Sequence, residues 1–156
     1  MARNAYQLLH EWNTVPGTKA DGAFDAGAFS SWLAETKRIA TDTGHLEIAT
    51  SQLGQVLPYA PPDADGLWID RIVAEALNAK DSKGMRSGFT CELFNQRGVH
   101  GFTSGKAERE LAQKNREKAE ALDARGYSRF ATAMREFAER YERDAEREES
   151  RDPHGD

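Results

Sequence analysis

One glycine-rich segment, residues 97–106, gathers the side chains best suited to binding an anion. It leads into a predicted helix, and unpaired backbone N–H groups at a helix N-terminus attract anions, while glycines let a ligand approach closely. The segment lacks the GxxxxGK[ST] spacing of a phosphate-binding loop, and Glu108 competes for the same helix dipole. A structural loop is the simpler interpretation, and anion binding is the alternative. The candidate anion-binding residues are Arg97, His100, Ser104 and Lys106.

Catalytic and metal-binding patterns are missing from the sequence. His10 and Glu11 are not followed by the second histidine of an HExxH zinc motif. Cys91 is the single cysteine, and the neighbouring Glu92 disfavours a reactive thiolate. A general base at His100 would need a nearby carboxylate or nucleophile that no linear motif reveals. We therefore predict that the protein is not an enzyme and holds no cofactor or metal.

Basic side chains recur between residues 97 and 118, which raises the question of nucleic-acid binding. Glu108, Glu110 and Glu117 dilute this basic field. The formal net charge of the chain is -5, whereas nucleic-acid binding relies on neutralising phosphates with Lys and Arg. A solvated helix face is the favoured interpretation, and nucleic acid is the weaker one. The basic residues are Arg97, Lys106, Arg109, Lys114, Arg116 and Lys118.

Length and composition indicate one intracellular domain. A chain of 156 residues suits a single domain over 1–149 with a tail, 150–156, that frays. Its longest apolar runs are only a few residues, too short for a membrane span, and the first residues lack the apolar stretch of a secretory signal. With one cysteine, an internal disulfide is excluded. We expect a cytoplasmic protein without membrane association.

Helical periodicity dominates the chain and predicts an all-α fold of about seven helices in antiparallel αα-hairpins. No self-similarity at a fixed period is found, so the arrangement is helical-array-like and not a true repeat. The predicted helices span about 4–13, 25–43, 45–57, 65–77, 82–96, 104–125 and 127–149.

Local signals refine these helices. Asp25 and Asp65 are predicted N-caps, and Gly44 is the predicted C-cap of the helix that Asp25 begins. Ile39 and Leu46 are assigned to inward faces. Other expectations are that Ser104 caps the sixth helix, that Gly84 and Gly88 weaken the fifth, and that the highly charged segment 142–149 projects into solvent.

Three tryptophans supply large apolar surfaces. Trp12, Trp32 and Trp68 lie within or beside helical stripes, which favours core positions. Trp68 is slightly off its stripe and is the best candidate for an exposed anchor at a protein interface. The interface candidates are Trp68, Arg97 and His100.

Several strings across most of the chain resemble a bacterial helical domain found at the C-terminal end of larger multidomain proteins. They are Phe29–Leu33, Ser51–Leu57, Ala60–Pro61, Asp63–Trp68, Phe94–His100, Arg135–Ala138 and Tyr141–Asp144. The resemblance implies a module that works beside other domains or subunits. It carries over no catalytic residue.

These features predict a non-enzymatic helical module for protein–protein interaction, either an adaptor subunit or the detached terminal domain of a larger bacterial system. The alternative is anion or nucleic-acid binding through residues 97–106 and the helix that follows. The expected partner is a protein, and the oligomeric state is left open.

Overall fold

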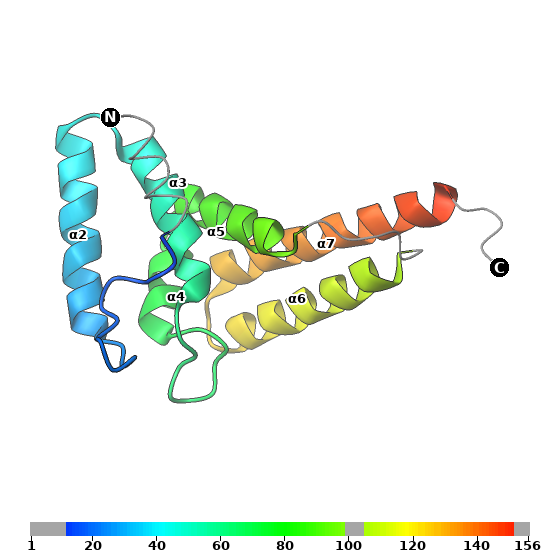
Figure 1. The fold of residues 1–156 in the computed structure, drawn as a ribbon, viewed down its shortest axis with the longest axis horizontal. Helices are drawn as coiled ribbons and strands as arrows, with labels where there is room; N and C mark the ends of the chain where they lie inside the picture. The colour runs from blue at the N-terminus through cyan, green and yellow to red at the C-terminus, as the bar shows by residue number, and fades with distance from the viewer. Residues whose placement is uncertain (1–11, 99–104, 152–156) are drawn as a thin grey trace. The chain divides into compact units, whose positions relative to one another are not determined.

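The computed structural model describes residues 12–98 and 105–151, and these form an all-α fold (Figure 1). The described residues contain six α-helices rather than about seven, and no strand beyond an isolated bridge between Thr18 and Phe24. The helices are α2 (Ala26–Asp42), α3 (Leu46–Val56), α4 (Arg71–Asn78), α5 (Lys83–Gln96), α6 (Lys106–Ala124) and α7 (Ser128–Arg151), with a 3-10 turn η1 (Leu57–Tyr59).

The difference in helix number arises at the first predicted helix, 4–13. Most of it lies outside the described residues, and its last two positions, Trp12 and Asn13, are not helical. At the other end, α7 includes Ser150 and Arg151, which we had assigned to the tail. The rest of that tail lies outside the described residues.

Backbone contacts group the chain into two compact units, Met1–Leu93 and Phe94–Asp156. The boundary falls within α5. Each unit buries apolar side chains of its own. A single domain over 1–149 stays a prediction.

In the first unit, α2 has the predicted N-cap, Asp25, whereas its C-cap is Thr43, one residue before the predicted Gly44. The Asp25 carboxylate accepts a hydrogen bond of 2.9 Å from the Ala28 N–H at the start of α2. Gly44 follows Thr43 with φ of 73°, a left-handed conformation that glycine adopts without penalty. The inward assignment of Ile39 and Leu46 is wrong, because both side chains are exposed. Both residues lie next to the turn that joins α2 to α3.

Glycines in α5 allow the backbones of α3 and α5 to touch. A β-carbon on Gly88 would overlap the Ser51 carbonyl oxygen, and one on Gly54 would overlap the Met85 carbonyl oxygen. A β-carbon on Gly84 would lie 2.8 Å from the Thr50 hydroxyl. Gly84 and Gly88 therefore do more than weaken a helix, as the sequence suggested, since they permit its closest packing contact.

The start of α4 corrects another predicted cap. Asp70, not Asp65, is the N-cap, and its carboxylate accepts a 2.8 Å hydrogen bond from the Ile72 N–H. Asp63 organises the preceding turn, because its two carboxylate oxygens accept hydrogen bonds from the Asp65 and Arg71 N–H groups. The aspartates of this turn thus fix where α4 begins.

In the second unit, α6 and α7 form an antiparallel hairpin and lie side by side along their length (Figure 1). Gly126 makes the turn with φ of 85°. The apolar residues of α7 recur at helical spacings of four, three, four and four, and all of them are buried: Phe130, Met134, Phe137, Tyr141 and Ala145.

The far end of α7 does not project freely into solvent, in contrast to the prediction. Ala145 is fully buried, and a β-carbon on Gly105 would lie 2.8 Å from its carbonyl oxygen. The N-cap of α6 is Gly105, with φ of 78°, and not Ser104. The start of α6 is therefore packed directly against the last turns of α7.

Candidate interaction surfaces

Arg97 is the candidate residue whose surroundings the structure defines best. Its guanidinium forms an ion pair with Glu108, and the two side chains are only 14% and 2% exposed. The Arg97 guanidinium carbon also lies 5.2 Å from the centroid of the Tyr141 ring. Arg97 Nε is buried and has no hydrogen-bond acceptor among residues 12–98 and 105–151. Most of this cation is therefore committed to contacts within the chain.

An aromatic stack extends from this ion pair to the surface. Tyr141 stacks on Phe94 with ring centroids 6.3 Å apart, and Phe137 meets Tyr141 edge to face at 5.0 Å. Arg140 covers the Phe94 ring, with its guanidinium carbon 5.3 Å from the centroid. Burial raises the pKa of the Tyr141 phenol, and the positive charges of Arg97 and Arg140 oppose this shift.

Charged side chains connect α6 to α7 along the hairpin. The Gly105 N–H donates a 3.0 Å hydrogen bond to the Glu148 carboxylate, and both oxygens of Glu149 accept from Arg109 at 2.7 Å. Two further ion pairs join Arg116 to Glu142 and Arg135 to Asp123. The predicted anion site at the start of α6 therefore faces carboxylates of the chain itself.

The other members of that predicted site are placed only in part. Lys106 is exposed at the first position of α6. His100 and Ser104 lie outside the described residues. Only Arg97 and Lys106 of the four candidates lie within the described residues, and anion binding here stays a prediction.

The basic residues between 97 and 118 are partly neutralised. Carboxylates pair with three of them, Arg97, Arg109 and Arg116. Lys114 is exposed, and Lys118 is half-buried, with its pKa lowered by burial and then by the charge of Lys114. At least three of these six cations therefore already have an anionic partner within the chain, and nucleic-acid binding by this face stays a prediction.

Trp68 contributes to packing in the first unit. It is half-buried, and its ring lies 6.2 Å from the Phe89 ring, centroid to centroid. Phe89 is itself fully buried in α5. Only part of Trp68 is therefore accessible, and its role as an interface anchor stays a prediction.

Three more exposed apolar side chains lie close in sequence on the two sides of the α2–α3 turn. Ile39, Leu46 and Ile48, which we call the hairpin surface, are 49%, 40% and 67% exposed. Sequence reasoning did not select them. One sequence signal could have identified these exposed side chains. Ile48 lies outside the buried stripe that contains Leu53 and Leu57.

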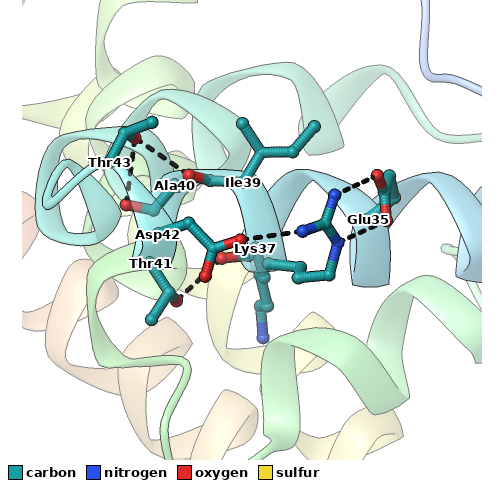
Figure 2. Close-up of polar contacts among 8 residues, drawn as sticks. Glu35, Lys37, Ile39, Ala40, Thr41, Asp42 and Thr43 are labelled. Carbon is teal, nitrogen blue, oxygen red and sulfur yellow. Dashed lines mark hydrogen bonds and ion pairs between the residues drawn. The ribbon is translucent and has the colours of Figure 1, made fainter.

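Polar groups on α2 flank the hairpin surface. The guanidinium of Arg38 donates hydrogen bonds of 2.7 Å to two carboxylates, those of Glu35 and Asp42, which are labelled in Figure 2. The hydroxyl of Thr43 donates to the Ile39 carbonyl oxygen at 2.9 Å. The hydrogen bond from Arg38 lowers the pKa of Glu35. Ile39 thus lies in a helical segment whose polar side chains are fixed by hydrogen bonds.

Two searches of the described residues gave negative results. No group of three or more His, Cys, Asp or Glu side chains within 12–98 and 105–151 is placed to hold a metal ion. Within the same ranges, no helix combines the length and the apolar character needed to cross a bilayer.

Comparison of the chain with known protein families, curated proteins and solved structures finds no match. The functional argument therefore rests on the surfaces described above.

Proposed function

We propose that this chain is a non-enzymatic module for protein–protein interaction and that it contacts its partner through the hairpin surface. One observation carries this proposal. Five large apolar side chains are exposed among the described residues, and three of them lie between positions 39 and 48. Exposed apolar groups concentrated at one place are typical of binding surfaces.

The physical basis is burial of these side chains in a complex. Removing apolar surface from water stabilises an interface by roughly 25 cal/mol per Å². Protein interfaces usually combine an apolar centre with a polar rim. Ile39, Leu46 and Ile48 supply the apolar part, and the ion-paired Glu35, Arg38 and Asp42 supply a polar border.

The charges on α6 favour this proposal over the alternative of anion or nucleic-acid binding. Arg97, Arg109 and Arg116 each have a carboxylate partner within the chain. A phosphate-binding surface would have to break these pairs or act through the few remaining lysines. A role as an adaptor subunit or as the terminal domain of a larger bacterial system agrees with the resemblance noted above and forms part of the proposal.

The test begins with affinity capture from the source cell and mass spectrometry, followed by titration of the purified partner. We expect Ile39→Ser with Ile48→Ser to weaken binding about tenfold or more, since both changes remove apolar contact area. The matched control is Lys80→Ser with Lys83→Ser, two exposed positions in the same unit. Circular dichroism checks that all variants are folded.

Two results would overturn the proposal. Undiminished partner binding by the folded double isoleucine variant would show that the hairpin surface is wrong. Capture of nucleic acid that is lost steeply between low and moderate salt would favour phosphate contacts instead.

A further inference from the structure

Four arginines lie on one face of the second half of α7. Arg140, Arg143, Arg147 and Arg151 follow one another at intervals of three, four and four residues. Because an α-helix has 3.6 residues per turn, this spacing places them in one stripe along the helix. We call this stripe the arginine face.

These arginines are exposed and only weakly paired. Arg143 is 55% exposed, and its Nη1 lies 3.9 Å from a Glu139 carboxylate oxygen. Arg147 is 73% exposed, and its Nη1 lies 3.4 Å from Asp144. Arg151, at the end of α7, forms no ion pair with any residue in 12–98 or 105–151. Exposed pairs with such geometry contribute little to stability and are readily exchanged for a better partner.

Acidic residues of the same helix are directed to α6 instead. Glu142 pairs with Arg116, Glu149 pairs with Arg109, and Glu148 accepts from the Gly105 N–H. Negative and positive side chains of α7 are therefore partly separated. These carboxylates bind the neighbouring helix, whereas the arginines face solvent.

Two hollows in the surface flank the arginine face. One, of about 330 Å³, is of mixed charge and is lined by Phe94, Arg97, Gly98, Glu108, Asp144, Arg147, Glu148 and Arg151. The second, of about 470 Å³, is lined by Arg143, Glu146, Arg147, Ser150 and Arg151. Arg147 and Arg151 line both. Side chains of a docked segment therefore have space on either side of these two cations.

We propose that the arginine face binds an acidic peptide segment of a partner protein, with spaced carboxylates of the peptide pairing with Arg143, Arg147 and Arg151. Guanidinium groups match carboxylates in planar, two-pronged hydrogen bonds. Asp144 and Glu146 interrupt the stripe, which disfavours a continuous polyanion such as nucleic acid but leaves room for separated carboxylates. This surface belongs to the second unit and is independent of the hairpin surface.

The experiment is a fluorescence anisotropy titration of the full chain with a labelled helical peptide whose glutamates recur every three or four residues. We expect Arg147→Glu with Arg151→Glu to weaken binding about tenfold, because attraction at two positions becomes repulsion. The control, Lys80→Glu with Lys83→Glu, makes the same change in net charge at exposed positions of the first unit. It should bind the peptide as the unaltered chain does.

If the double glutamate variant is not helical by circular dichroism, Arg147→Gln with Arg151→Gln tests the same pairs with less perturbation. Three results would overturn the proposal: no binding of the peptide at low salt, equal losses in the α7 and control variants, or tighter binding of a single-stranded RNA oligomer than of the peptide. The double isoleucine variant should still bind the peptide. Failure of one surface therefore does not imply failure of the other.

Discussion

Gly88 of α5 lies directly against the carbonyl oxygen of Ser51 in α3. The nearest carbon of α3, the Ser51 carbonyl carbon, would be 3.0 Å from a β-carbon at this position, and the Gly54 Cα would be 3.2 Å from it. The contact involves backbone atoms on both sides, so no side chain can rotate away to make room. The distance between these two helices is set by the absence of a side chain.

The first prediction follows from this contact. Gly88→Ala should destabilise the fold by about 1–3 kcal/mol, the usual cost of overpacking. Gly27→Ala is the matched control, because Gly27 is exposed in α2. A β-carbon on Gly27 would come no closer than 3.4 Å to a neighbour, the Asp25 carboxylate oxygen. Alanine has the higher helix propensity, so this control should change stability by less than about 1 kcal/mol in the favourable direction. Urea denaturation measures the free energy of unfolding of both variants. Equal changes in this free energy would contradict the close packing of Gly88 against α3.

A second prediction concerns the ion pair between Arg97 and Glu108. Arg97→Met leaves the carboxylate of Glu108 buried without this cation, which should cost about 3–5 kcal/mol. Arg97→Met with Glu108→Met should lose less, since no buried charge remains. Arg109→Met serves as the control and should have little effect, because the Arg109–Glu149 pair is exposed. A double variant less stable than Arg97→Met would count against this account.

A third prediction is a dependence of stability on pH through Asp25. The hydrogen bond from the Ala28 N–H, aided by Lys19, holds the pKa of the Asp25 carboxyl below its usual value. A lowered folded-state pKa gives stability that is present above the unfolded pKa, about 4, and is lost as pH falls through the folded value. Asp25→Asn keeps a capping side chain but does not titrate. The difference in melting temperature between the two proteins should therefore change between pH 5 and pH 2. A difference that stays constant over this pH range would contradict the prediction.

A fourth prediction concerns Tyr141. Burial raises the pKa of its phenol, so one tyrosine should ionise at higher pH than an exposed one. The sign for stability is opposite to that of Asp25: the contribution is present below the unfolded pKa, about 10, and is lost as pH rises through the folded value. Titration of absorbance near 295 nm should lose its late phase in Tyr141→Phe.

Local chain chemistry made much of the fold predictable. Asp25 marks the start of a helix because its carboxylate accepts a backbone hydrogen bond, and Gly44 and Gly126 follow helix ends because glycine, without a side chain, readily adopts a positive φ. The buried stripe of α7 follows from apolar spacing alone. The boundary at Asp65 failed because the turn contains several aspartates that can each act as a cap. Only the hydrogen bonds formed in the folded turn select Asp70.

The sequence by itself determined the helical class, most helix boundaries and the buried stripe of α7, because caps and periodicity act within a few residues along the chain. The tertiary structure decided which charges are paired, why Gly84 and Gly88 are glycine, and which apolar side chains stay exposed. Those properties depend on the distance between helices far apart in sequence. Arg97 illustrates the difference: its position suggested a ligand site, whereas its packing against Glu108 and Tyr141 commits most of its charge within the protein.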